Sequence, residues 1–460
     1  MRSPQYEINI QGMIINYCQI PILIKNNLKM KKFSLIIVVT ICISILTLSG
    51  QYDKPGKFGP GNKVYSGVNI HFTTGHEKDL DMIAAAGFKI IRMDFGWQST
   101  ERENGVYNWS AYDELTANLN KRGIRALYIL DYSNSLYEKQ TESKDPISGN
   151  ITRSIAAPQN EESVTAFAKW AAASASHFRG NNIIWEIWNE PNINFWRPAP
   201  DVVQYNKLAV ATCNAIRKAV PEAIIIGPAT SQLPVPFIES FLASGITEYI
   251  DAVSVHPYRR YYLSPETAIE DYNKIRELIG KYTPEGKSDI PIISSEWGYS
   301  SSTKGVSVET QAAYIVRMQL SNMVYGIPFS IWYDWKNDGS DPEEHEHNFG
   351  TVTNDLELKP AYTAIKNMND QLKDFTFLRR LDVKRGNDFV LLFRDDKGNR
   401  KIAAWTTEVP HYAVLEELEI KVTGMTAKDW AGNELKVSTE QGKIVIDLSP
   451  LPQYISVPGR

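Results

Sequence analysis

The sequence predicts an α/β fold, a (β/α)8 TIM barrel followed by a small C-terminal β-sandwich domain. From about residue 64, short apolar strand-like runs alternate eight times with amphipathic helical patterns. No glycine-rich phosphate loop follows the first strand, which disfavours the alternative of a doubly wound open sheet. Beyond residue 374, short strands with period-two alternation and turn residues replace the helices. The 460 residues accommodate a barrel of about 250 residues or more together with a second domain.

The N-terminal segment has the composition of an export signal. We expect residues 1–29 to be an over-extended gene start and residues 30–50 a secretory signal peptide, with Lys31 and Lys32 before an apolar run over residues 33–46. A membrane anchor is the alternative, but the run is shorter than the ~20 residues that a span needs. Cys213 is the only cysteine after residue 50, so no intramolecular disulfide is expected there. We therefore expect an exported bacterial protein, periplasmic, cell-surface or extracellular, with no stable membrane span after signal removal.

The barrel is expected to occupy residues 51–373. Its eight strands are predicted at residues 67–72, 89–95, 125–131, 183–189, 223–228, 252–256, 290–296 and 329–333. The helices that follow them are predicted at residues 77–86, 111–121, 162–177, 202–220, 236–243, 266–279, 309–325 and 361–372. Eight strand-helix units in sequence favour closure of the sheet into a barrel.

Residues 374–460 are expected to form the β-sandwich. Its strands are predicted at residues 388–394, 401–406, 415–422, 443–448 and 454–457. No cluster of catalytic residue types lies in this segment. We expect it to brace the barrel, with glycan binding as the alternative.

Charge and aromatic content restrict the partners. The net charge is −4 with both signs interspersed, so neither nucleic acid nor a polyanion is indicated, and a neutral substrate fits better. Six of the eleven tryptophans fall at or just after predicted strand ends, where indoles can stack on sugar rings: Trp97, Trp188, Trp196, Trp297, Trp332 and Trp335.

Two glutamates follow predicted parallel strands at the same end of the barrel. The apolar run from Ile183 leads into Trp188-Asn189-Glu190-Pro191-Asn192, and the run from Pro291 leads into Glu296-Trp297-Gly298. Glycoside hydrolysis needs two carboxyl groups, one to protonate the leaving oxygen and one to attack the sugar or activate water. If the groups lie about 5 to 5.5 Å apart, their charges compete and one of them becomes the proton donor.

Seven of the eight strand ends supply a polar, ionisable or indole group. A single Arg or His inside a barrel is more often a structural ion-pair partner than a catalyst. The convergence of many such groups at one end favours an active site there. Besides the two glutamates, these groups are His71, Arg92, Asp94, Asp131, Asn189, Thr230, His256, Tyr258, Trp332 and Asp334.

These motifs together resemble the retaining glycoside hydrolases of clan A, most closely the family 39 group with its family 5 relatives. The resemblance covers about residues 64–372. It rests on the Asn189-Glu190-Pro191 and Glu296-Trp297-Gly298 motifs and on the stretches Glu101–Trp109, Asn348–Val352 and Lys359–Tyr362.

The resemblance implies that Glu190 is the acid/base and Glu296 the nucleophile. It also implies that Arg92 and Tyr258 contact Glu296, and that Asn189 contacts the sugar 2-hydroxyl. Supporting and substrate-binding roles are expected for His256, which would bond the acid/base or a sugar hydroxyl, for Trp332, which would form the floor of the subsite, and for His71, Asp131 and Trp196.

The sequence departs from the family pattern in several places. Asp131 ends the third strand where many family 5 cellulases carry a His, which makes cellulose a doubtful substrate. Glu186 is expected to point into the barrel as an ion-pair partner. The His345-Glu346-His347 stretch could bind a metal, but in a charged loop we expect it to be solvated. No metal and no organic cofactor are expected.

The sequence therefore predicts a retaining β-glycoside hydrolase that cleaves a neutral polysaccharide or oligosaccharide by double displacement. Aromatic residues in the loops after the third and fourth strands (Tyr137, Phe195 and Trp196) favour several subsites and endo action. An exo-acting enzyme such as a β-xylosidase is the alternative. From another class, a non-catalytic glycan-binding protein on a TIM barrel remains open.

Overall fold

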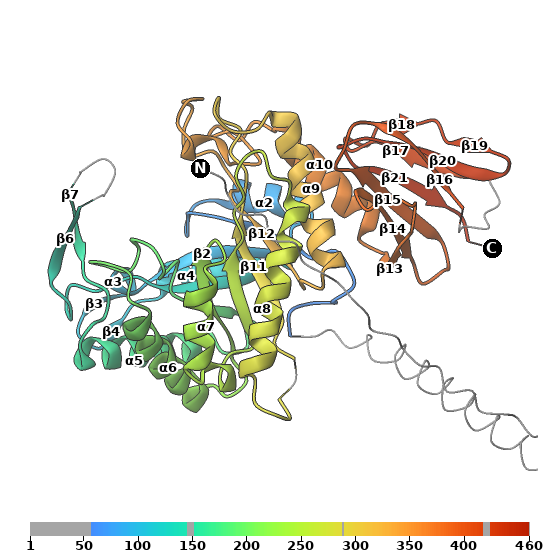
Figure 1. Cartoon of the computed structure of the whole chain (residues 1–460). Helices are drawn as coiled ribbons and strands as arrows, with labels where there is room; N and C mark the ends of the chain where they lie inside the picture. The colour runs from blue at the N-terminus through green and yellow to red at the C-terminus, as the bar shows by residue number, and fades with distance from the viewer. Residues whose placement is uncertain (1–56, 145–150, 288, 417–423, 460) are drawn as a thin grey trace, which may run out of the picture. The chain divides into compact units, whose positions relative to one another are not determined.

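The computed structural model describes residues 57–144, 151–287, 289–416 and 424–459 (Figure 1). These residues fall within one compact unit, which spans residues 54–460. The predicted gene-start extension and signal peptide, and most of the predicted strand 415–422, lie outside the described residues. Within the described residues, no helix combines the length and the hydropathy required to span a membrane.

Eight parallel strands close into a barrel, as predicted. Every strand of the barrel is within a few residues of its predicted position. The strands are β1 Ser66–Asn69, β2 Ile90–Gly96, β5 Arg125–Asp131, β8 Ile184–Ile187, β9 Ile224–Ser231, β10 Ala252–His256, β11 Ile292–Trp297 and β12 Ser330–Trp332.

Strand alternation explains why these strands are continuous apolar runs. On β5, Leu127 and Ile129 belong to the apolar cluster inside the barrel, whereas Tyr128 and Leu130 belong to the cluster shared with the surrounding helices. Both faces of a barrel strand are thus buried, and an apolar residue is favourable at each position. Polar residues enter only toward the C-terminal ends, where the barrel opens.

Helices follow the barrel strands and pack around them. Three of them are capped by a side chain that accepts backbone N–H groups: Asn160 before α5, Asp201 before α6 and Ser307 before α9. The helices are α2 Glu77–Ala85, α4 Ser110–Lys121, α5 Glu161–His177, α6 Val202–Ala219, α7 Val235–Ala243, α8 Ile269–Tyr282, α9 Val308–Val324 and α10 Pro360–Leu372.

Short elements in the connecting loops were not predicted from the sequence. They are too short or too exposed to produce a hydrophobic period. They comprise α3 Trp97–Thr100, the hairpin β3 Glu101–Glu103 with β4 Val106–Tyr107, the hairpin β6 Gln140–Lys144 with β7 Ile151–Ile155, and the 3-10 helices η1 Ile246–Glu248, η2 Pro265–Ala268 and η3 Glu346–Asn348.

The C-terminal region is the predicted two-layered β-domain. One sheet has six strands in the order β13 Thr376–Arg380, β14 Asp388–Arg394, β15 Arg400–Thr406, β21 Gln453–Val457, β17 Thr426–Lys428 and β18 Glu434–Leu435. The other contains β16 His411–Leu415, β20 Lys443–Leu448 and β19 Ser438–Glu440. Strands β13 and β17 to β19 were not predicted from the sequence, and β16 shares only Leu415 with the predicted strand 415–422.

The six-stranded sheet buries both faces. Val390 and Leu392 on β14 belong to the core of the sandwich, whereas the alternate residues Phe389 and Leu391 belong to the same apolar cluster as the barrel and its helices. Trp405 on β15 joins that larger cluster. The two domains therefore share one continuous core, which supports the predicted bracing role.

Candidate active site

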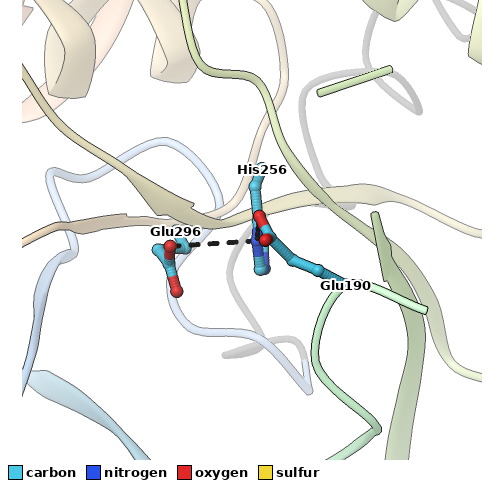
Figure 2. Close-up of side chains that lie close together, drawn as sticks. All are labelled: Glu190, His256 and Glu296. Carbon is cyan, nitrogen blue, oxygen red and sulfur yellow. Dashed lines mark hydrogen bonds and ion pairs between the residues drawn. The ribbon is translucent and has the colours of Figure 1, made fainter. Parts of the chain in front are cut away.

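Glu190 and Glu296 lie together at the open end of the barrel. Glu296 is on β11, and Glu190 follows the end of β8. One carboxylate oxygen from each and one ring nitrogen of His256 all lie within 4.8 Å of one another. Figure 2 shows both carboxylates beside the His256 ring. This spacing is close to the roughly 5 to 5.5 Å of a retaining glycosidase pair.

The backbone after β8 turns in an unusual way to present Glu190. Trp188 and Glu190 both have positive φ, 65° and 47°, values that L-residues other than glycine, asparagine and aspartate seldom adopt. The Glu190 N–H donates to the Ala229 carbonyl (3.0 Å), which holds this turn against the neighbouring strand β9. Backbone strain of this kind persists where surrounding contacts enforce it, and it concentrates at functional sites.

Arg92, on β2, binds the nucleophile candidate from below. Its Nη1 donates to Glu296 Oε2 (2.5 Å) and to Asn69 Oδ1 (3.3 Å). Its Nε donates to Glu186 Oε2 (2.7 Å). Both Arg92 and Glu186 are fully buried, so Glu186 is the structural ion-pair partner that the sequence predicted.

The other terminal nitrogen of Arg92, Nη2, contacts two further side chains. Nη2 donates to Asn189 Oδ1 (2.8 Å) and faces His256 Nε2 at 3.2 Å. A guanidinium has five N–H donors, and these contacts with the three above occupy all five. The planar guanidinium of Arg92 therefore orients polar side chains on or next to four strands, β1, β8, β10 and β11.

His256 connects Arg92 with Glu190. Because a guanidinium can only donate, the neutral imidazole accepts at Nε2 and carries its proton on Nδ1. Nδ1 lies 2.9 Å from Glu190 Oε1, so it donates to that carboxyl. His256 was predicted to bond either the acid/base or a sugar hydroxyl; in the structure it bonds Glu190, and its side chain is fully buried.

Glu296 is held in its ionised form. Burial opposes ionisation, but the positive charge of Arg92 and the hydrogen bond from Tyr258 outweigh it and lower the pKa of Glu296 below its usual range. The Tyr258 hydroxyl donates to Glu296 Oε1 at 2.8 Å. The contacts predicted for Arg92 and Tyr258 are both present.

Within the described part of the chain, one N–H of the Asn189 amide has no hydrogen-bond partner. Its Oδ1 accepts from Arg92, and its Nδ2 donates to the Tyr132 hydroxyl (2.8 Å). An amide nitrogen has two N–H groups, so one is left to reach a ligand in the cavity. That geometry is compatible with the predicted contact to a sugar 2-hydroxyl.

The cavity above the two glutamates has a volume of about 470 Å³. Four carboxylates line it, from Asp94, Glu190, Glu296 and Glu346. Six of the ten predicted site residues line it: His71, Arg92, Asn189, Glu190, Tyr258 and Glu296. We call it the catalytic cavity.

The structure corrects the prediction for two tryptophans. Trp332 has no exposed surface; its indole N–H donates to the Phe349 carbonyl (3.3 Å), so it cannot form the floor of a subsite. The next residue, Tyr333, lines the cavity instead. Trp196 is also fully buried, against Trp188, and its neighbour Phe195 lines the cavity.

The predicted clustering of tryptophans at strand ends is a feature of the core. All six are buried, with exposures of 0 to 1%, so none offers an indole face to a sugar in the catalytic cavity. The sequence could not separate these alternatives, because an indole at a strand end can point inward or outward.

Asp131 is a further correction. It is fully buried, so it does not contact a substrate. Burial and the negative charge of Asp94 raise its pKa well above its usual range. Asp94 itself lines the cavity.

His71 reaches the cavity from the β1 side. Its Nε2 lies 3.1 Å from Asp334 Oδ2. Burial opposes protonation of His71, but the hydrogen bond and charge of Asp334 outweigh it and raise its pKa to about 9.

The His345-Glu346-His347 stretch belongs partly to this site. His345 and Glu346 are exposed, as expected, but they also line the catalytic cavity. Among the described residues, the one group with metal-ligand geometry is Glu190, His256 and Glu296. The Arg92 guanidinium already lies against Glu296, and this positive charge disfavours a cation there.

Several lining residues were not predicted from the sequence. Most end a barrel strand or follow directly after it, so a prediction extended by one residue would have found them. Glu346 and Phe349 lie in the long loop after β12 and give no such signal. The missed residues are Asn69, Tyr132, Ser231, Gln232, Tyr333, His345, Glu346 and Phe349.

Comparisons with known sequences agree with the predicted resemblance. The family model described as Cellulase (glycosyl hydrolase family 5) matches residues 59–339. A "Beta-xylosidase" of Geobacillus stearothermophilus is 29% identical over 167 residues, 32% of this chain and 33% of the relative. A "Beta-xylosidase" of Caldicellulosiruptor saccharolyticus is 22% identical over 307 residues, 61% of each chain. The chain thus spans between a third and three-fifths of the length of these relatives.

Solved structures give the same result for the fold. A family 39 glycoside hydrolase from Bacteroides cellulosilyticus WH2 superposes with a TM-score of 0.73 at 26% identity, covering 88% of this chain and 82% of the other. A GH39 β-xylosidase from Caulobacter crescentus superposes with a TM-score of 0.62 at 18% identity, covering 86% and 96%, and shows the shared fold.

Proposed function

The chain belongs to the clan A glycoside hydrolases, in the cellulase family (glycosyl hydrolase family 5) whose model it matches, and from this premise we propose that it is a retaining β-glycoside hydrolase acting by double displacement. One observation supports this most strongly: an oxygen of Glu190 and an oxygen of Glu296 lie within 4.8 Å of each other at the open end of the barrel.

In the first step, Glu296 attacks the anomeric carbon while Glu190 donates a proton to the leaving oxygen, and the glycosidic bond breaks. In the second, Glu190 takes a proton from water, the water oxygen attacks the anomeric carbon, and the bond to Glu296 breaks. The lowered pKa of Glu296 suits the nucleophile, which must be ionised before the sugar arrives.

The surrounding contacts assign supporting roles. Arg92 and Tyr258 hold the two oxygens of Glu296, so the attacking carboxylate has a fixed orientation. The free N–H of Asn189 would donate to the sugar 2-hydroxyl, a contact that strengthens as the oxocarbenium-like transition state develops. His256 would orient Glu190 through Nδ1.

A neutral sugar fits the catalytic cavity. The carboxylates that line it would repel an anionic ring at the cleavage position, whereas hydroxyl groups can donate to them. The names of the two curated relatives favour a β-xyloside, and we propose a β-linked xylose-containing polysaccharide or oligosaccharide as the first substrate to test.

Cavities on both sides of the catalytic cavity favour endo action. A cavity of about 260 Å³ shares Tyr132 and Phe195 with it, and another of about 380 Å³ shares Tyr258, His345 and Phe349. A chain of sugars bound across all three would extend beyond the cleaved bond at both ends. Exo action, as the relatives' names suggest, is the alternative, and the sizes of the products released from a xylan distinguish the two.

An aryl β-xyloside with a good leaving group tests the catalytic roles. Glu296→Ala should abolish turnover, whereas Glu190→Ala should retain part of it, because such a leaving group needs little protonation. Added azide should restore turnover to Glu190→Ala and yield the β-glycosyl azide. Glu103→Ala, which removes an exposed carboxylate on β3, is the matched control.

The same assay tests the competing proposal, a glycan-binding protein on an inactive barrel. Equal and negligible effects of both substitutions on any residual turnover would favour that reading. Export is a separate proposal that rests on Lys31, Lys32 and the apolar run over residues 33–46. N-terminal sequencing of the protein secreted from its host tests it.

A further inference from the structure

A second cavity adjoins the catalytic cavity and has the opposite charge. Its volume is about 380 Å³, and three residues, Tyr258, His345 and Phe349, are common to both. Three cationic residues line it: Arg259, Arg260 and Lys304. None of the described residues that line it is an aspartate or glutamate. We call it the cationic cavity.

Two of the three cations are available to a ligand. Arg259 Nη2 is paired with Asp271 (2.8 Å), but within the described residues neither Arg260 nor Lys304 has a carboxylate within ion-pair distance. Both are exposed. Arg260 Nη1 donates to the Tyr262 hydroxyl (3.1 Å), which orients the guanidinium; its other nitrogens have no partner among the residues that the structure describes.

Unpaired surface cations are common and are usually only hydrated. Here they share a concave site with aromatic rings, and Tyr261 and Tyr262 are each 58% exposed, unusually open for tyrosines. Aromatic faces next to hydrogen-bond donors suit a sugar ring with a charged substituent. The cavity also begins at Tyr258, whose hydroxyl binds Glu296. A group bound here therefore lies next to the bond that would be cleaved.

We propose that the cationic cavity is a subsite for a carboxylate or sulfate group carried by a sugar residue adjoining the one cleaved. This inference rests on the proposed function and refines it: the sugar in the catalytic cavity is neutral, and its neighbour or a branch on that neighbour is anionic. A guanidinium binds carboxylate and sulfate oxygens through paired N–H groups, and the Lys304 ammonium adds a second charge.

The net charge of −4 gives no indication of the cationic cavity. Global charge governs long-range attraction, but recognition of one substituent depends on the few groups within hydrogen-bond distance. The prediction of a neutral substrate from composition therefore applies to the cleaved sugar and not to the whole glycan.

Matched oligosaccharides test the proposal. The probes are a xylo-oligosaccharide with one glucuronic acid branch, the same compound with its carboxyl group reduced to an alcohol, and a singly sulfated xylo-oligosaccharide. For the wild-type protein we expect kcat/KM to be at least about 10-fold higher for the acidic branch than for the reduced one, equivalent to one charge-assisted hydrogen bond.

The double variant Arg260→Ala/Lys304→Ala should lose this preference and keep its kcat/KM on the reduced compound. Lys207→Ala, which removes an exposed lysine on α6 away from both cavities, should keep the preference. The preference should also weaken as salt is raised. A higher rate with the sulfated compound than with the carboxylate would identify sulfate as the group bound. Equal kcat/KM for the acidic and reduced compounds would overturn the proposal.

A binding measurement separates this inference from the proposed function. If no probe is hydrolysed, calorimetry with the acidic and reduced compounds still decides. Tighter binding of the acidic compound to the wild type, lost in the double variant, would support the subsite while the proposed function failed. Equal binding of both compounds would reject the subsite.

Discussion

Two buried arginine-glutamate pairs stabilise different parts of this molecule in different ways. Arg92 and Glu186 lie under the catalytic cavity, and Arg317 and Glu266 lie where the barrel meets the sandwich; all four side chains are almost inaccessible to solvent. Burying such a pair is costly unless further hydrogen bonds satisfy both groups. The two sites meet that requirement to different degrees: both oxygens of Glu266 accept hydrogen bonds, whereas the buried Oε1 of Glu186 has no partner among the described residues.

At the domain interface, the arginine and the glutamate bind each other through two hydrogen bonds. Arg317 Nε and Nη2 donate to the two oxygens of Glu266 (2.8 and 2.9 Å), and Trp405 Nε1 donates to the same carboxylate (2.8 Å). Because Trp405 is on the sandwich and Glu266 on the barrel, this contact joins the domains. Under the catalytic cavity, Glu186 uses only one of the five donors of Arg92. The other four orient polar groups around the reacting carboxylates, so this pair serves the site and the other serves stability.

Breaking the interface pair should give the largest effect. Arg317→Met leaves the Glu266 charge buried without its partner, so the free energy of unfolding should fall by about 3–5 kcal/mol while kcat of the folded protein is retained. Chemical denaturation and aryl xyloside turnover measure the two quantities. The double variant Arg317→Met/Glu266→Leu should recover much of the loss; a double variant as unstable as the single one would contradict this explanation.

Substitution of Arg92, under the catalytic cavity, should instead lower activity more than stability. Arg92→Lys keeps the charge but supplies three donors in place of five, so His256 and Asn189 lose their fixed orientation. We expect kcat/KM to fall about 100- to 1,000-fold, comparable to the loss of one donor that stabilises a transition state. The melting temperature, measured in parallel, should change less than for Arg317→Met. Near wild-type turnover would show that the orientation of His256 and Asn189 does not depend on the Arg92 guanidinium.

A smaller change at the interface should sharpen the contrast. Trp405→Phe removes the N–H that reaches Glu266 but retains the ring that stacks on Phe389, with centroids 4.8 Å apart. The loss of one hydrogen bond to a buried charge predicts a decrease of about 1.5–3 kcal/mol in the free energy of unfolding. Activity at 25 °C should be unchanged. A decrease in kcat would mean that the sandwich influences the catalytic cavity.

The smallest expected change is in pH dependence. Tyr258→Phe removes one of the interactions that lower the pKa of Glu296, so this pKa should rise toward its usual range. Ionised Glu296 is required for attack, and activity is therefore lost as pH falls through this pKa. The acidic limb of the kcat/KM profile should move to higher pH in the variant. The same sign applies to stability: a lowered carboxyl pKa contributes stability above the pKa of the unfolded chain, which is lost as pH falls through the folded value. An unshifted acidic limb would assign it to another group.

The sequence predicted the barrel because each strand and helix carries its own hydrophobic period. It also predicted the position of both glutamates, since strand ends of a barrel meet at one face. It could not predict which way a side chain turns beyond a strand end. Trp332 and Tyr333 illustrate this: neighbours at the end of β12 face the core and the cavity respectively. The same one-residue ambiguity separates Trp196 from Phe195 and Asp131 from Tyr132.

The cationic cavity could not be predicted for a different reason. Arg260 and Lys304 are far apart in sequence, and each alone resembles an ordinary surface cation. Only the tertiary structure shows that they share one concave site, which no carboxylate of the described residues lines.

The saturation of Arg92 has a consequence for inhibition. A buried cation beside a water-filled cavity would ordinarily capture small anions from the buffer. Here each N–H of the guanidinium already has a protein acceptor, so chloride or phosphate would have to displace one of them to bind. Activity should therefore change little as the concentration of chloride or phosphate in the buffer is raised.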